Sequence, residues 1–234
     1  MNAALIRLLH LASPTLPVGA YSYSQGLEWA VETGAVNKEA TALAWIGECL
    51  EFGIARFEAV YVAHMLVAWA QGDRARLTEL DADFVASRES AELRAETLQM
   101  GYSLARLLVD LTEAPAAPLA DFSEPSFPLA WSCAATAWAI PAQDAVAGYL
   151  WAWTENQVMA AVKAVPLGQT AGQRMLLALG QRIPALAEEA VVSPLDTTHN
   201  YLPAFAIACS CHKASNIRWP AVCPSGTAFT AAMT

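Results

Sequence analysis

The chain has 234 residues, of which 56% are hydrophobic and 15% charged, and its formal net charge is −9. That length allows one large domain or two small ones with a sizeable core. An acidic balance without any run of lysine or arginine argues against nucleic-acid binding. The apolar excess predicts that part of the surface is covered by other protein chains.

The sequence does not favour a membrane protein. A long stretch without charge, residues 125–143, is interrupted by Pro125, Pro128 and Pro141, whereas a spanning helix needs about 20 predominantly apolar residues. The opening MNAALIRLLHLASP is too short and too weakly basic for a signal peptide. Five cysteines, an odd number without an export signal, do not predict a disulfide framework. We therefore expect a cytoplasmic protein.

The stretch SPTLPVGAYSYSQGLEWAVETG predicts a stiff loop that leads into a helix. Pro14 and Pro17 fix φ and keep the chain extended after a short first helix. Ser22 and Gln25 fit a capping box at the start of the next helix, which would end at Gly34. The inner face of that helix would consist of Leu27, Ala30 and Val31.

Apolar residues recur at steps of three and four over most of the remaining chain, which predicts an all-α fold. Asn37 is the expected N-cap of one long helix, or of two joined near Gly47 and Gly53, with its end at Gly72. A second helical tract is expected over about residues 74–112.

The second half of the chain follows the same pattern. The segment from 114 to 128 contains four prolines and is expected to be a linker or an exposed loop. Nearly uncharged helices are expected over about 129–182, in the centre of the fold. With no strand-length alternation and no repeat, the sequence predicts a single-domain bundle of roughly eight to ten helices.

No catalytic motif is present. The sequence lacks HExxH, GxSxG and CxxC, and GQTAGQR at Gly168 lacks the GK[ST] ending of a phosphate-binding loop. Arg88, Glu92 and Glu96 recur at steps of four, which puts them on one helix face if the segment is helical, usually a solvated one. Lys163 is a lone charge in an apolar tract, and it either reaches towards the surface or marks a contact.

The sequence CSCHK near the end contains residues that suit zinc, nickel or copper. Thiolates of Cys209 and Cys211 and the imidazole of His212 would be the ligands, with His199 a little before them. Their spacing fits no common zinc motif, so a structural role for these residues is the competing interpretation.

Four stretches resemble the UreF family of urease accessory proteins. The first is LLHLASPTLPVGAYSYSQGLEWAVETG, which is similar to the N-terminal signature of that family. The others follow in the same order: RESAELRAETLQMGYSLARLL, VMAAVKAVPLGQTAGQRML and PAFAIACSCH. The resemblance spans about residues 5–212. It implies an all-helical domain over residues 1–212 and a divergent tail, expected to be disordered, over residues 213–234.

The ending departs from the family pattern. Family members continue with a stretch like RHETQYSRLFRS, whereas here Cys211 stands where arginine is expected and His212 alone fits. In the family this ending packs against an accessory partner of the D/H type, so the resemblance does not extend that contact to this tail.

The resemblance implies a non-catalytic, typically dimeric protein that acts in the maturation of the nickel enzyme urease. It would join the D/H-type accessory protein and the G-type GTPase on apo-urease and help to couple GTP turnover to nickel delivery. No cofactor is expected to be bound directly, because nickel would be handled by the assembled complex. The partner-binding residues implied by the motifs are Tyr21, Ser22, Gln25, Gly26, Glu28, Arg88, Glu92, Glu96, Lys163, Gln169, Gln173 and His212.

Two other functions stay open at this point. One is a metallochaperone that itself binds nickel through Cys209, Cys211 and His212. The other is an unrelated helical enzyme that uses Glu28 or Glu92 as an acid or base, although the sequence shows no partner group for either carboxylate.

Overall fold

The structure is a computed structural model that describes residues 3–20, 25–111 and 114–198. Within these ranges it is helical and contains no strand, which confirms the expected all-α fold. The helices in chain order are α1 (Ala3–Leu11), α2 (Leu27–Glu32), α3 (Glu39–Glu48), the π-helix η2 (Cys49–Glu58), α4 (Ala59–Gln71), α5 (Arg74–Ala86), α6 (Ala91–Asp110), the 3₁₀-helix η3 (Ala114–Asp121), α7 (Phe127–Ala137), α8 (Ala142–Ala164), α9 (Gln169–Gly180), α10 (Ile183–Val192) and the short 3₁₀-helix η4 (Leu195–Thr197).

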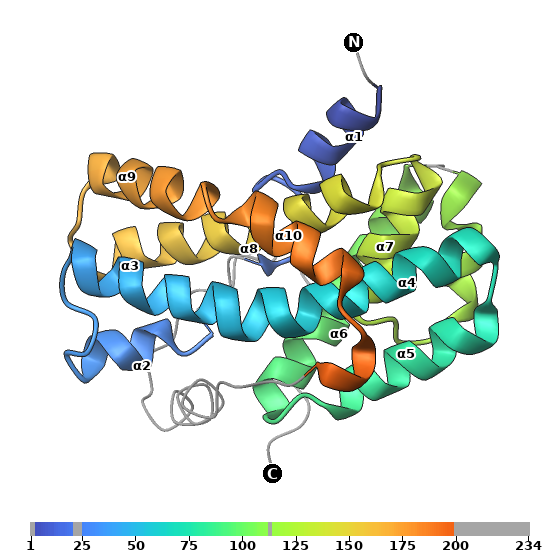
Figure 1. Ribbon diagram of the computed structural model, residues 1–234, viewed down its shortest axis with the longest axis horizontal. Helices are drawn as coiled ribbons and strands as arrows, with labels where there is room; N and C mark the ends of the chain where they lie inside the picture. Colours follow the sequence, from blue (N-terminus) through green and yellow to red (C-terminus); the bar gives the residue numbers. More distant parts are fainter. Residues whose placement is uncertain (1–2, 21–24, 112–113, 199–234) are drawn as a thin grey trace.

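One continuous rod, Glu39–Gln71, organises the bundle and consists of α3, η2 and α4. It runs across the view of Figure 1, with α10 and α7 packed against α4, α8 packed against α9 and α10, and α6 packed against α7. The expectation of one long helix is confirmed, and Gly72 ends it in the left-handed conformation, with φ of +66°. The N-cap is Lys38 instead of Asn37, because the Thr41 hydroxyl accepts hydrogen bonds from the backbone N–H groups of both residues.

The rod is also the one helix within the described ranges that is long and apolar enough to cross a membrane. Most of its apolar window, 72%, is buried inside the protein. A buried core helix passes the same test of length and composition, so this helix is weak evidence for a membrane span.

The helical tract expected over about residues 74–112 is confirmed, whereas the expectation of a linker or exposed loop over 114–128 was wrong in part. The tract 74–112 is two helices, because Ser90 caps α6 by accepting a hydrogen bond from the N–H of Leu93 at 3.1 Å. The segment 114–128 is not simply a loop, since it forms η3 and the first turn of α7. Pro128 is tolerated there because its missing N–H would have no partner in a first helical turn.

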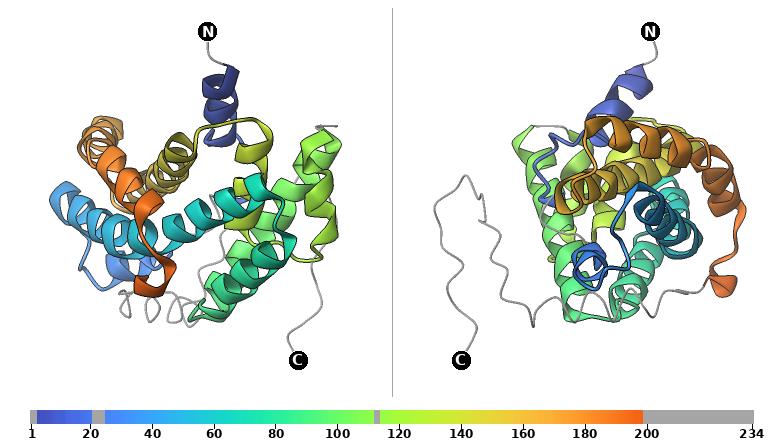
Figure 2. Two further views of the ribbon diagram at one scale, coloured as in Figure 1. Left: turned by 45° about the vertical axis from the view of Figure 1, so that its right-hand side comes forward. Right: turned by 90° about the vertical axis from the view of Figure 1, so that its left-hand side faces the viewer.

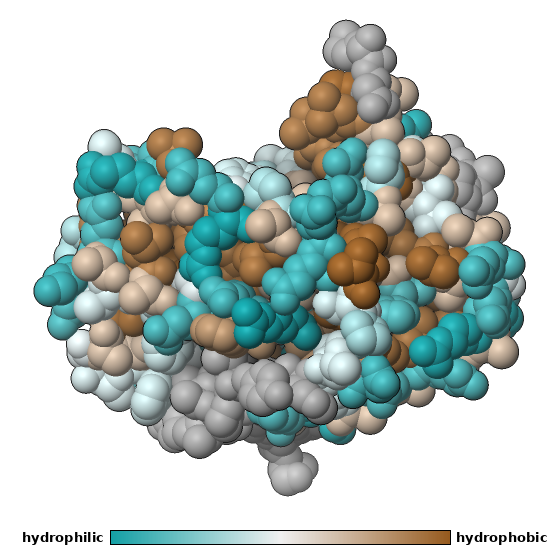
Figure 3. Space-filling model, viewed as in Figure 1, coloured by the Kyte–Doolittle hydropathy of each residue, from teal (hydrophilic) through white to brown (hydrophobic). Residues whose placement is uncertain are grey.

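The helices share one hydrophobic core that extends from Leu11 to Ala190. Trp131 of α7 and Phe84 of α5 are among its largest fully buried side chains. One element stands apart from this compact arrangement: α1 projects from the body in all three ribbon views (Figures 1 and 2). Its side chains Leu5, Ile6 and Leu9 are exposed, and Figure 3 shows an apolar patch on the projection.

The start of α7 is fixed by a very close approach to α6. A Cβ atom added at Gly101 would lie 2.0 Å from the carbonyl oxygen of Pro125. Two side chains satisfy backbone donors at the same place: Asp81 accepts from the N–H of Ser126 at 3.1 Å, and Thr97 accepts from that of Phe127 at 3.2 Å. Glycine at position 101 is therefore a packing requirement.

We expect Gly101→Ala to lower the free energy of unfolding by about 2–3 kcal/mol or more, because the methyl group overpacks against backbone that cannot move aside cheaply. Ser103→Ala, two residues along the same helix and partly exposed, is the control and should change stability by about 0.5 kcal/mol or less. Chemical denaturation measures both. A Gly101→Ala protein as stable as wild type would contradict this description of the α6–α7 contact.

Candidate functional site

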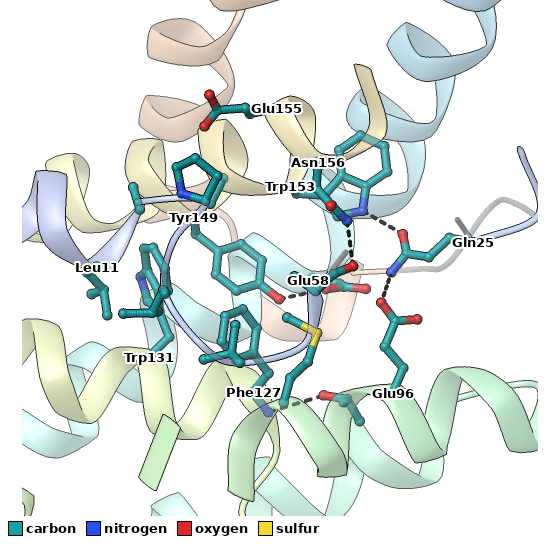
Figure 4. Close-up of a pocket in the computed structure, with 18 of the residues that line it drawn as sticks. Leu11, Gln25, Glu58, Glu96, Phe127, Trp131, Tyr149, Trp153, Glu155 and Asn156 are labelled. Carbon is teal, nitrogen blue, oxygen red and sulfur yellow. Dashed lines mark hydrogen bonds between the residues drawn. The ribbon is translucent and has the colours of Figure 1, made fainter. Parts of the chain in front are cut away.

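A pocket lies between the N-terminal segment and helices α6, α7 and α8, with about 840 Å³ of empty space when solvent at its mouth is counted (Figure 4). Its walls are mainly apolar and include Leu16, Val18, Met100, Phe127 and Trp131. Buried polar side chains join these walls, so the pocket combines an apolar lining with a charged interior.

A buried ion pair lies beside this pocket. The Nη1 atom of Arg88 donates to Oε1 of Glu58 at 2.5 Å, and the two side chains are only 6% and 8% exposed. The hydroxyl of Tyr149 donates to the other carboxylate oxygen of Glu58 at 2.7 Å. The Arg88 guanidinium also lies over the ring of Phe84, 4.8 Å from its centroid. Glu58 is thus satisfied by a cation and a phenol at a position largely removed from solvent.

The π-helix explains how a glutamate on the rod comes to point inward. Glu58 is the last residue of η2, in which hydrogen bonds run from i to i+5 and shift the side chains relative to an α-helix. Residues 53–55 and 57–63 are all buried, so this part of the rod has almost no solvent face. Helices of this kind occur mostly as local departures from α-helix and are frequent at functional sites.

A second set of polar contacts connects three separate parts of the chain. Nε2 of Gln25 donates to Oε1 of Glu96 at 2.6 Å, and the indole nitrogen of Trp153 donates to Oε1 of Gln25 at 2.6 Å. Burial raises the pKa of Glu96 to about 8. The hydrogen bond from Gln25 lowers that pKa, the charge of Glu58 raises it and the charge of Arg88 lowers it. At neutral pH the Glu96 carboxyl is therefore mostly protonated.

The sequence predicted that Arg88, Glu92 and Glu96 lie on one solvated helix face, and the structure corrects this. Arg88 precedes α6 and is buried, and Glu96 is 8% exposed, so neither side chain forms part of a solvated face. Glu92 is intermediate in exposure. The reason is that α6 packs against α7 and the pocket, which the spacing of charges alone does not reveal.

The remaining predicted partner-binding residues fall into two groups. Gln25 lines the pocket with Arg88 and Glu96, whereas Gly26 is buried at the N-cap of α2 and Glu28 is half-buried in its first turn. The predicted capping box is not the start of this helix: α2 begins at Leu27, and Gly26 at its N-cap makes no side-chain cap bond. Tyr21, Ser22 and His212 lie outside the described residues.

The surface residues of the α8–α9 junction form the second group. Lys163 is exposed in the last turn of α8, where a cation interacts favourably with the helix dipole. Gln169 and Gln173 are exposed in the first half of α9. None of the three lines the pocket. The structure therefore separates the predicted residues into an interior set and an exposed set.

Nothing in residues 3–20, 25–111 and 114–198 forms a metal centre, since no group of three or more His, Cys, Asp or Glu side chains there could hold a metal ion. Cys209, Cys211, His212 and His199 lie outside the described residues. Among described cysteines, Cys49 and Cys133 are both buried, and burial raises each thiol pKa to about 12. Such thiols are poor nucleophiles and poor metal ligands at neutral pH.

The enzyme interpretation gains no support from the pocket. Glu28 and Glu92 do not line it. The carboxylate of Glu58 is held by Arg88 and Tyr149, so it is fully engaged in internal contacts. Tyr149 is an unsuitable base or nucleophile because burial and the neighbouring Glu58 hold its pKa well above the usual value.

Sequence reasoning missed Glu58, Tyr149 and Trp153. One signal for Glu58 was available: it is a charge inside the apolar stripe of the rod, between Phe57 and Tyr61. The partners of a buried charge cannot be read from one sequence, because Arg88 and Tyr149 are 30 and 91 residues away.

Comparison with known proteins defines the class of this helical chain, whose sequence has no catalytic motif. A model of the UreF family matches residues 36–180. The urease accessory protein UreF of Azoarcus sp. (strain BH72) is 59% identical over 219 residues, which cover 92% of this chain and 94% of that protein. The UreF proteins of Dechloromonas aromatica (strain RCB) and Methylobacillus flagellatus are 55% and 47% identical, over 89% and 88% of this chain and 93% and 92% of their own lengths.

The chain belongs to the UreF family of urease accessory proteins. Its role is therefore in urease maturation, as the resemblance in the sequence indicated.

We expect Arg88→Met to lower the free energy of unfolding by about 3–5 kcal/mol, because Glu58 is left buried without its cation. The double variant Glu58→Gln with Arg88→Met leaves no buried charge and should be less destabilised than the single variant. Denaturant titration of both proteins measures the difference. A single variant within about 1 kcal/mol of wild type would show that the pair is not buried as described.

Glu96 makes stability depend on pH in a defined window. Its pKa rises from 4.5 in the unfolded chain to about 8 in the folded one, so the folded protein holds a proton that the unfolded chain releases. The stabilising effect of that proton is complete below pH 4.5 and is lost as the pH rises through about 8. Unfolding measured from pH 5 to 9 should show a shallower decline for Glu96→Gln than for wild type, and parallel curves would contradict the assignment.

Proposed function

We propose that the chain is a non-catalytic scaffold that regulates the accessory GTPase and supports nickel insertion into the active site of apo-urease. The observation that carries the proposal is the 59% identity to a urease accessory protein over almost the full length of both chains. The partners are the D/H-type accessory protein, the G-type GTPase and apo-urease itself, and the complex works in the cytoplasm. Nickel is the cargo of the assembled complex.

The structure supports this proposal through the separation of interior and exposed residues. Arg88 and Glu96 are engaged in internal bonds and shape the fold, whereas Lys163, Gln169 and Gln173 are exposed on neighbouring helices. A surface with one cation and two amides suits polar contacts with a partner. We assign the GTPase contact to this surface, which we call the α8–α9 surface.

The projecting helix supports the dimer that we include in the proposal. Leu5, Ile6 and Leu9 on α1 are between 50% and 59% exposed, while Leu11 at its end is buried in the core. Apolar side chains gathered on one face of a projecting helix mark a protein contact. We propose that a second copy of the chain covers them.

The direct test is urease activation in a bacterial host that expresses urease and all its accessory proteins except the UreF-family member. Two versions of this chain are supplied: the natural one and one with the ending RHETQYSRLFRS after residue 210. Restored urease activity and restored nickel content with either version support the proposal. If only the second version restores them, the failure of the natural chain is caused by its tail. Failure of both, with soluble protein present, contradicts the proposal.

Lys163→Ala should leave the fold intact, because the side chain is exposed, yet weaken urease activation. If Lys163 lies in the contact, its loss should reduce affinity for the GTPase about five- to tenfold, or roughly 1–1.4 kcal/mol. Arg106→Ala removes another exposed cation, on α6, and serves as the matched control. If Lys163→Ala at normal expression activates urease as well as wild type does, Lys163 takes no part in the proposed GTPase contact.

A further inference from the structure

Gln25 has a backbone conformation that is unusual for its residue type. Its φ of +48° lies in the left-handed region, and within the described ranges only Ala139 among other non-glycine residues shares a positive φ. Gly26 follows with φ of +85°, so two successive left-handed residues lead into α2. A left-handed conformation costs a residue with a Cβ roughly 1–2 kcal/mol, so surrounding contacts must hold Gln25 in place.

The Gln25 side chain is bonded at both ends to helices that are far away in the sequence. Its oxygen accepts from the indole of Trp153 on α8, and its nitrogen donates to Glu96 on α6. The indole N–H can only donate, which fixes the amide orientation: the oxygen faces Trp153 and the nitrogen faces Glu96. We call these three residues the Gln25 bridge; Figure 4 shows them meeting at one side of the pocket.

A further bond connects the same helix to the chain before the bridge. Asn156, three residues after Trp153 on α8, donates to the carbonyl oxygen of Ala20 at 2.8 Å. Positions three apart lie on one helix face, so a single face of α8 holds the chain both at Ala20 and at Gln25. The start of α2 is thereby tied to the body of the bundle.

Helix α2 needs such ties. With six residues it is far shorter than the roughly 12–15 residues that an isolated helix needs, so tertiary contacts must define its position. Leu27 and Ala30 are fully buried and hold its inner side, whereas Glu28 keeps part of its side chain towards solvent. The bridge sets where this outward part of α2 lies relative to α6 and α8.

We propose that Gln25 is a positioning residue, which through Glu96 and Trp153 holds α2 in the orientation needed to bind the accessory partners. The inference rests on the proposed function for the identity of those partners, while the bridge itself rests on geometry alone. The sequence predicted that Gln25 and Glu96 bind a partner. In the present proposal they instead hold α2 in place, and neighbouring residues make the contact.

The charges around the bridge make its strength depend on pH. Glu96 is faced by Glu58 from η2, by Arg88 from the turn before α6, by Tyr149 from α8 and by Gln25. When Glu96 loses its proton, a charge is buried away from water and is repelled by Glu58; the hydrogen bond from Gln25 and the charge of Arg88 favour the ionised form but do not offset that cost, so the closed arrangement is disfavoured. The bridge should therefore loosen as the pH rises above about 8. In Glu96→Gln the amide oxygen still accepts from Gln25 and does not titrate.

The indole N–H of Trp153 reports on the bridge directly. Its ¹H–¹⁵N resonance, assigned by its loss in Trp153→Phe, should shift with pH in wild type, with a midpoint near 8, and should not titrate in Glu96→Gln. Gln25→Ala should move the resonance at every pH, because the acceptor is gone. An unchanged Trp153 resonance in Gln25→Ala would overturn the bridge.

Binding then tests the positioning role. The affinity for the accessory GTPase is measured with the D/H-type partner present, for wild type, Gln25→Ala, Glu96→Gln and the control Gln99→Ala, whose exposed amide donates to Ser103 on the same helix. We expect Gln25→Ala to bind about tenfold more weakly than wild type at pH 7, at a temperature well below its unfolding midpoint, so that the loss is not a loss of folded protein. Glu96→Gln should match wild type at pH 7 and keep its affinity at pH 9, where wild type weakens.

The outcomes separate the two proposals. Wild-type affinity of Gln25→Ala, in a protein whose Trp153 resonance has moved, overturns the positioning role and leaves the proposed function intact. Equal weakening by the Gln99→Ala control would also overturn it. No binding and no urease activation by wild type, with or without the family-like ending, would instead refute the proposed function, and the positioning role with it, although the resonance would still establish the bridge.

Discussion

The ion pair between Glu58 and Arg88 is the interaction on which the rest of the interior depends. Both side chains are more than nine-tenths buried, and removing charges from water is costly unless each one is paired and hydrogen-bonded. Here the carboxylate receives Arg88 and the Tyr149 hydroxyl, so the long rod, the turn before α6 and helix α8 must meet at one place. The pair therefore specifies an arrangement of three elements, whatever its net effect on stability.

The same pair sets the electrostatics of the neighbouring carboxyl. Glu96 has a raised pKa because it is buried, and the negative charge of Glu58 adds to that effect while Arg88 opposes it. A protonated Glu96 can accept from Gln25 without bringing a second negative charge into the interior. Glu96 thus interacts both with the buried ion pair and with Gln25. Through it, the Gln25 bridge connects this part of the interior to the start of α2.

Much of the fold could be predicted from sequence, because helical periodicity in an apolar chain is a strong local signal. The rod and its end at Gly72 follow from such local rules. The break at Ser90 was missed although serine is a common N-cap, since the apolar pattern runs on across it. The burial of Arg88 and Glu96 could not be predicted at all, because it depends on partners more than twenty residues away.

The residues of the resemblance led to the right family, yet they did not reveal what each residue does. Gln25 and Glu96 were expected at a partner surface and instead bond to each other inside the pocket wall. Lys163, in contrast, is exposed as a contact residue should be. The residues of one family motif thus divide into buried and exposed sets, which the sequence alone does not separate.

We propose that this chain acts as a scaffold that assembles with the accessory GTPase and the D/H-type partner. Light scattering coupled to size-exclusion chromatography, on the purified chain alone and mixed with both partners and a GTP analogue, tests it most directly. We expect a dimer of the chain alone and a stable complex containing all three proteins in the mixture. A folded chain that elutes apart from both partners, even with the ending RHETQYSRLFRS in place, would contradict the scaffold role.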